Sequence, residues 1–131
     1  MAGAGASGDA ELGAFPELFL EVDYVRDGLR TGLAEDRVPE VIEAARSLPH
    51  LRLAGLMTIA PAPEFDGDTR RARAVFANLR RLSERLPQDA FLNSRALLSM
   101  GMSSDFEIAI EEGSDCVRIG SALFEDEEAR P

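Results

Sequence analysis

Short apolar segments alternate with segments of helical periodicity along this chain of 131 residues, and the alternation limits its fold more than any other feature. The apolar segments are strand candidates at residues 18–22, 51–59, 96–100 and 115–119. Helices are predicted between them, over residues 38–48, 68–86 and 104–113. Strands that alternate with helices are usually parallel and joined by right-handed crossovers. The predicted fold class is therefore α/β, either half of a TIM barrel, which usually has about 250 residues, or a small open sheet.

The ends of the last two predicted strands favour the half-barrel. Glycines, serines and Arg118 gather there. In a full barrel, the loops after the seventh and eighth strands often form a phosphate site together with the N-terminus of a short helix. We therefore expect roughly a (βα)4 unit that corresponds to strands 5–8 of a barrel. This domain would occupy residues 14–131, after a flexible tail of small residues at 1–13.

Local signals indicate where the helices begin and end. Pro39 is tolerated in the first turn of the first helix, whose apolar face is expected to reach Leu48. Ser104 and Glu107 have the spacing of a capping box at the start of the third helix. The middle helix carries arginines opposite its apolar face. They form either a surface for an acidic partner or, as is more common, a solvated helix exterior.

Charge and composition exclude several classes of function. The net charge is -10 at pH 7 and the isoelectric point is near 4.5, which argues against nucleic acid and anionic membranes as partners. No secretory signal or apolar membrane span is recognisable, and the single Cys116 fits a reducing compartment, so a cytoplasmic location is expected. We interpret Cys116 as a packing residue, and the neighbouring Glu111 and Glu112 as solvated carboxylates rather than metal ligands.

Residues 99–104 are the first candidate for an anion site. Gly101 allows the backbone to approach a ligand closely, and a helix that starts after Ser103 and Ser104 would present free N–H groups to phosphate. Plain N-capping by one serine is the alternative. Arg118 ends an apolar strand two residues before Gly120, and it either forms a salt bridge or contacts an anionic or aromatic ligand.

From Phe19 to Phe124 the sequence resembles the C-terminal half of the pyridoxal phosphate homeostasis protein family, which is alanine racemase N-terminal-domain-like and of fold type III. The resemblance is carried by residues 55–59 (GLMTI), 98–103 (LSMGMS), 105–107 (DFE), 109–113 (AIEEG) and 117–124 (VRIGSALF). It covers nearly all of this chain and about the second half of the family's usual length. Members are held to manage free pyridoxal 5'-phosphate rather than to turn over amino acids.

The resemblance implies roles for particular residues. Ser99, Gly101, Met102 and Ser103 match the loop that holds the cofactor's phosphate. A second phosphate loop corresponds to Gly120 and Ser121. Arg118 matches the arginine beside the pyridine nitrogen, where it would keep that nitrogen unprotonated and weaken the ring as an electron sink.

The chain departs from the family in its basic residues. All 14 lysine and arginine positions are arginine, so the Schiff-base lysine of the family's first strand has no counterpart. Where relatives often have a lysine and a glycine after the fifth strand, this chain has Arg30, Thr31 and Gly32. A guanidinium does not form a Schiff base. We therefore expect non-covalent, readily reversible binding of pyridoxal 5'-phosphate and no enzymatic activity.

Two other hypotheses remain open. Half a barrel exposes sheet edges and one side of its core, which proteins normally avoid. The chain could therefore complete a barrel as a homodimer, or with a separate polypeptide that supplies the other half and its lysine. It could also be an inactive gene fragment.

Overall fold

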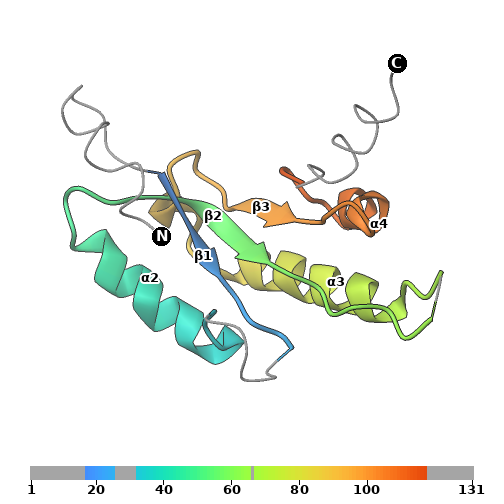
Figure 1. Ribbon diagram of the computed structural model, residues 1–131. Coiled ribbons are helices and arrows are strands. Elements are labelled where there is room, and N and C mark those ends of the chain that lie inside the picture. The colour runs from blue at the N-terminus through green and yellow to red at the C-terminus, as the bar shows by residue number, and fades with distance from the viewer. Residues whose placement is uncertain (1–16, 26–31, 66, 118–131) are drawn as a thin grey trace, which may run out of the picture.

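The computed structural model describes residues 17–25, 32–65 and 67–117, and it contains a parallel sheet with helices packed against it (Figure 1). In chain order the elements are β1 (Glu17–Glu21), the 3-10 helix η2 (Glu35–Arg37), α2 (Val38–Arg46), β2 (Arg52–Thr58), α3 (Arg70–Arg85), the 3-10 helix η3 (Gln88–Ala90), β3 (Leu97–Met100) and α4 (Phe106–Glu111). The strands lie in the order β1-β2-β3, and both pairings are parallel. The predicted α/β alternation is confirmed over this region.

A further parallel bridge continues the sheet beyond β3. Cys116 pairs with Ser99, and the Met100 amide donates a 3.0 Å hydrogen bond to the Cys116 carbonyl. The predicted strand at 115–119 therefore begins where expected, on the free side of β3. Its last two residues, and the predicted tail at 1–13, lie outside the described residues.

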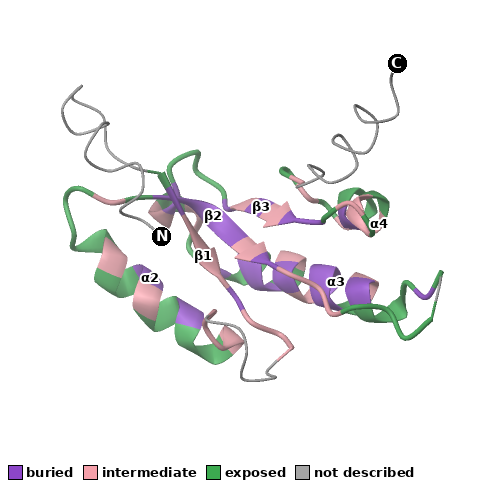
Figure 2. Ribbon diagram, viewed as in Figure 1, coloured by how far each residue is buried: buried purple, intermediate pink, exposed green. Residues whose placement is uncertain are grey.

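One face of the sheet is buried under the helices. Leu56 pairs in register with Leu98, and Thr58 with Met100, and all four side chains are buried. Leu56, Leu98 and Met100 belong to one core cluster with Ile42 of α2 and apolar residues of α3. Figure 2 shows the buried residues of α3 on the side of the helix that faces the sheet.

The opposite face of the sheet is covered less completely. Side chains alternate between the two faces along a strand, so the rows between the buried ones point to this second face. Phe19 of β1 and Leu97 of β3 both pair with Gly55 of β2, and Met57 pairs with Ser99. Phe19, Met57, Leu97 and Ser99 are all only half-buried. The sheet thus has a fully packed helix side and a partly open inner side.

Three local expectations were wrong. Leu48 is 51% exposed because α2 ends at Arg46, before the turn that contains it. Cys116 is exposed rather than packed in the core of the described chain. The Ser104–Glu107 capping box is absent, since α4 begins at Phe106 and has no side-chain cap from its N-cap residue, Asp105.

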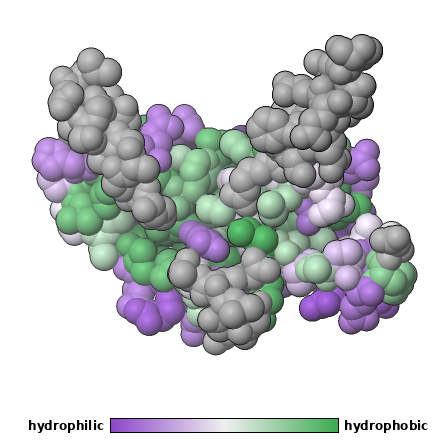
Figure 3. Space-filling view, in the orientation of Figure 1, coloured by the Kyte–Doolittle hydropathy of each residue, from purple (hydrophilic) through white to green (hydrophobic). Residues whose placement is uncertain are grey.

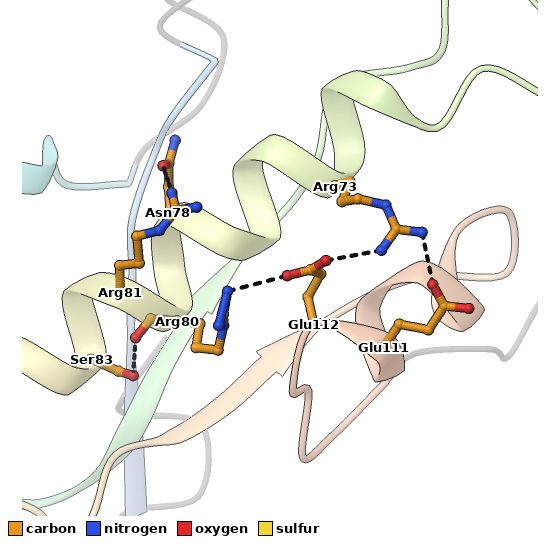
Figure 4. Close-up of polar contacts among 7 residues, drawn as sticks. All are labelled: Arg73, Asn78, Arg80, Arg81, Ser83, Glu111 and Glu112. Carbon is orange, nitrogen blue, oxygen red and sulfur yellow. Dashed lines mark hydrogen bonds and ion pairs between the residues drawn. The ribbon is translucent and has the colours of Figure 1, made fainter.

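The arginine face of α3 is neither a free acidic-partner surface nor a simple solvated exterior. Arg73 donates to Glu112 at 2.9 Å and to Glu111 at 2.7 Å, while Arg80 donates to Glu112 at 3.4 Å (Figure 4). The Glu112 side chain is only 15% exposed, so its interpretation as a solvated carboxylate was wrong. This ion-pair cluster joins α3 to α4 and holds α4 beside the sheet.

Candidate functional site

The site is built at the carboxyl ends of the strands, where a parallel sheet brings its loops to one edge. Thr58 at the end of β2 lies in register with Met100 at the end of β3. The buried Thr58 hydroxyl donates a 2.7 Å hydrogen bond to the Val22 carbonyl, and the Val22 amide donates to the Met57 carbonyl at 2.8 Å. These bonds fix the ends of the first two strands together, and the chain after β3 starts from the same edge.

Gly101 turns the chain sharply at the end of β3. Its φ of +106° lies in a region that favours glycine, and the residue is buried. A methyl group there would lie 2.6 Å from Cβ of Ala109, 3.2 Å from Cα of Phe106 and 3.2 Å from Cγ1 of Val117. The backbone of Gly101 is therefore enclosed between α4 and the segment that continues the sheet, so no larger residue fits.

The turn after Gly101 is closed by Asp105. The Met102 amide donates to Oδ1 of Asp105 at 2.7 Å, and the Asp105 amide donates to the Met102 carbonyl at 3.0 Å. This pair has the form of half a capping box, with the carboxylate reaching back three residues to an N–H group. Because the Met102 amide already donates to this carboxylate, an anion at the turn would rely on the following N–H groups and on the serine hydroxyls.

The other residues of the turn differ in exposure. Ser103 is half-buried, Ser104 is exposed, and Met102 is 43% exposed. A cavity of about 40 Å³ lies beside the turn, lined partly by Ser104, Asp105 and the buried Asp68. Hydrogen bonds from Arg70 hold the pKa of the Asp68 carboxyl below its usual range. That volume suits a water molecule and is too small for a cofactor ring.

The segment that leads to the second predicted loop is anchored on β3. The Asp115 carboxylate accepts from the Leu98 amide at 2.8 Å and from the Arg95 guanidinium at 2.8 and 3.2 Å. The bonds from Arg95 hold the pKa of Asp115 below its usual range. Val117, the last described residue, lies against the Gly101 turn.

The structure therefore brings together one group of the sequence-predicted site residues. Ser99, Gly101, Met102 and Ser103 form a continuous strand end and turn at the carboxyl edge of the sheet. Arg118, Gly120 and Ser121 lie outside the described residues. Among the described residues, no group of three or more histidine, cysteine, aspartate or glutamate side chains is arranged to hold a metal ion. In the same part of the chain, no helix is long and apolar enough to cross a membrane.

Sequence reasoning missed the two aspartates that shape this edge. Asp105 carries a local signal, because a carboxylate three residues after the start of a turn is half of a capping pattern. The observed pair, Met102 and Asp105, lies two positions before the predicted pair, Ser104 and Glu107. Asp115 carries none. Its partners, Arg95 and Leu98, are distant in sequence, and only the fold brings them to it.

Comparison with known proteins agrees with this arrangement. Residues 7–128 match the family model described as alanine racemase, N-terminal domain. The chain belongs to this family. It is also similar to curated proteins named pyridoxal phosphate homeostasis protein: it is 38% identical over 108 residues to that of Aquifex aeolicus and 43% identical over 105 residues to that of Pseudomonas aeruginosa. The family resemblance inferred from the sequence is confirmed.

Those matches cover most of this chain but less than half of each relative. The shares are 82% of this chain and 46% of the Aquifex protein, and 80% and 42% for the Pseudomonas protein. PipY of Synechococcus elongatus without PLP is 32% identical, with a TM-score of 0.73 over 88% of this chain and 52% of that one. PipY with PLP bound gives 30% identity and a TM-score of 0.66 over the same shares. The parallel α/β sheet is thus part of a barrel fold.

Proposed function

We propose that this chain binds pyridoxal 5'-phosphate non-covalently and grips it mainly by its phosphate. The observation that carries the proposal is the enclosed Gly101 turn at the carboxyl edge of the sheet, which leads into the half-buried Ser103. Serine hydroxyls and backbone N–H groups are common phosphate ligands. Support also comes from a similar solved protein that has PLP bound and from curated relatives named for pyridoxal phosphate homeostasis.

The donor set fits the phosphate better than it fits the aldehyde. Ser99, Gly101, Met102 and Ser103 would form one side of the phosphate site, with the Met102 amide itself kept by Asp105, and Gly120 and Ser121 would form the other. Arg118 would lie by the pyridine nitrogen. The chain contains no lysine, so none of its side chains could hold the cofactor's aldehyde as a Schiff base. We therefore propose binding without amino-acid turnover by this chain.

Equilibrium titration tests the proposal directly. The absorption spectrum of pyridoxal 5'-phosphate should shift saturably as protein is added, and dialysis should restore the free protein. Treatment with borohydride should leave the mass of every internal peptide unchanged, because no lysine imine can be reduced. Pyridoxal without its phosphate should bind more weakly by a factor of about ten or more, if the phosphate supplies about 1.4 kcal/mol or more.

A serine substitution gives a matched control. Ser103→Ala removes a hydroxyl from the turn and should weaken binding of the phosphorylated ligand. Ser47→Ala removes an exposed hydroxyl at the end of α2, which donates a 2.8 Å hydrogen bond to the Ala44 carbonyl, and should leave binding unchanged. Flat titration curves from a folded sample would contradict the proposal, and so would equal affinities for the two ligands.

The open inner side of the sheet favours a second proposal, that further βα units complete the barrel. Phe19, Met57 and Leu97 are half-buried there, and Figure 3 shows apolar surface in the middle of the view between the segments drawn in grey. In the described part of the chain, the outer edge of β1 is met only by the Val22–Leu33 bridge. We propose that a polypeptide with the other half of the barrel covers this face.

Association measurements decide between the partners. Co-expression with the N-terminal half of a relative such as PipY should give a stable 1:1 complex, whereas light scattering of this chain alone would detect a homodimer. If the chain is a compact monomer and forms no complex with the N-terminal half, both the homodimer and the two-chain barrel are contradicted. A folded chain that neither associates nor binds the cofactor would leave the hypothesis of an inactive gene product.

A further inference from the structure

A cavity of about 330 Å³ lies between the second half of α3 and the start of β3. The buried Ala96 and Leu98 supply apolar lining. Its charged lining comes from Arg80 and Glu84 of α3 and from Arg95, which precedes β3. Small-molecule sites usually have volumes of about 300–1,000 Å³, so this cavity suits a small ligand.

Arg80 has hydrogen-bond donors to spare at this cavity. Its guanidinium donates one long bond, 3.4 Å, to Glu112 (Figure 4). Its Nε is buried and has no acceptor among the described residues. A buried donor without an acceptor is costly, and folded proteins usually satisfy it with a protein group, a water molecule or a ligand. A carboxylate is a strong acceptor for a guanidinium, because its two oxygens match two N–H groups.

Glu84 brings a charge of the opposite sign to the same cavity. It follows Arg80 by four residues, so the two side chains share one face of α3. Glutamate and arginine at this spacing commonly pair, but Arg80 reaches instead to Glu112, and Glu84 has no ion pair within the described ranges. Arg95 is already bound by both oxygens of Asp115, at 2.8 and 3.2 Å. The cavity therefore offers one incompletely paired cation and one unpaired anion, a single helical turn apart.

We propose that this cavity binds a small zwitterion, of which α-amino acids are the commonest kind. The carboxylate of the ligand would bind Arg80, its ammonium group would bind Glu84, and an apolar side chain would lie against Ala96 and Leu98. A simple anion would be repelled by the glutamate and a simple cation by the arginine, so a ligand with both charges fits best. The cavity lies at the start of β3 and the Gly101 turn follows its end, so this site does not depend on the proposed cofactor binding.

Calorimetric titration of the full chain with L-leucine and two analogues tests both contacts. Leucine carries both charges, whereas leucinamide lacks the carboxylate and 4-methylpentanoate lacks the ammonium group. Leucine should bind saturably, and each analogue should bind about tenfold more weakly or worse, because each loses one ion pair. Equal affinities for the three compounds would overturn the proposal, and so would the absence of saturable leucine binding to a folded sample.

Charge-removing variants examine each contact separately. Glu84→Gln should weaken leucine binding about tenfold while the affinity for 4-methylpentanoate stays equal or rises, a selective change that loss of stability cannot produce. Arg80→Gln should remove the preference for leucine over leucinamide. Two controls should change neither preference: Arg81→Gln, whose side chain bonds Asn78 outside this cavity, and Glu43→Gln on the exposed face of α2. Unchanged preferences in Glu84→Gln and Arg80→Gln, or equal losses in the controls, would refute the site.

Discussion

Replacement of Gly101 by alanine is the sharpest test of how the candidate turn is built. Two independent costs arise at this position. The backbone has a φ of +106°, which L-residues rarely adopt, and the new methyl group would lie 2.6 Å from Cβ of Ala109. Ala109 belongs to α4 and is fully buried, so it cannot move aside without shifting the helix.

The magnitude follows from the two terms. Strained backbone at a non-glycine residue costs about 1–3 kcal/mol. Forcing an extra methyl group into a packed region costs about another 1–3 kcal/mol. Gly67→Ala separates the terms, because Gly67 also has positive φ, +84°, but has no heavy atom within 4 Å of the added methyl group. Gly67→Ala should therefore show the strain alone, and Gly101→Ala should be less stable than it by about 1–3 kcal/mol.

Urea unfolding followed by far-ultraviolet circular dichroism measures the difference. With a slope of about 1–3 kcal/mol per molar urea, the midpoint of Gly101→Ala should lie about 1 M below that of Gly67→Ala. Loss of the folded baseline in Gly101→Ala alone would have the same meaning. Equal midpoints for the two variants would refute the reasoning, because they would show that α4 does not pack on the backbone of Gly101.

Three further changes test the polar contacts that fix the sheet and its helices. Thr58→Val should destabilise the fold by about 1–3 kcal/mol, because it leaves the buried Val22 carbonyl without its hydroxyl donor, and Thr58→Ser should restore most of the loss in urea midpoint. Glu112→Ala removes the shared partner of two α3 arginines and should cost about 1–2 kcal/mol by thermal unfolding, whereas the exposed Glu43→Ala should cost less than about 0.5 kcal/mol. The pKa of Asp115 is lowered in the fold by the guanidinium beside it, so its stabilisation is complete above the unfolded value of about 3.9 and is lost as pH falls through the folded value. The urea midpoint of the wild type should therefore fall more steeply below about pH 4 than that of Asp115→Asn, and parallel curves would contradict this.

The strands and helices could be predicted from the sequence because their signals are local. The segment predicted as a strand at 51–59 became β2 at Arg52–Thr58, and the helix predicted over 68–86 became α3 at Arg70–Arg85. Apolar periodicity and flanking prolines give the type of an element well and its ends less well. Parallel pairing followed from the alternation itself.

Two of the errors concern polar side chains whose partners differ from those that the sequence pattern indicates. Ser104 and Glu107 have capping spacing, but α4 begins only at Phe106, and the side-chain bond formed at this turn is the one from the Met102 amide to Asp105. Glu112 resembled a solvated charge, although α3 places two arginines over it. Contacts between elements of this kind depend on how the helices cross, and a single sequence contains no direct record of that.

The candidate site could also be predicted only in part. Gly101 was singled out because glycine allows the backbone to approach a ligand closely, whereas the positive φ and the contacts with Ala109, Phe106 and Val117 already account for a glycine there. The second predicted loop, at Gly120 and Ser121, lies outside the described residues. Arg118, Gly120 and Ser121 therefore remain predictions from the family resemblance.

The charge distribution explains why so much depends on geometry at this edge. Between Leu97 and Val117 the sequence contains carboxylates but no arginine or lysine. The arginines of α3 that face α4 are already paired with Glu111 and Glu112. An anion at the Gly101 turn would therefore be held against a negative background, chiefly by oriented N–H groups and hydroxyls, with Arg118 the next basic residue along the chain. Donors of that kind bind only when they converge, so a small change in register at β3 would cost more here than it would in a site rich in basic side chains.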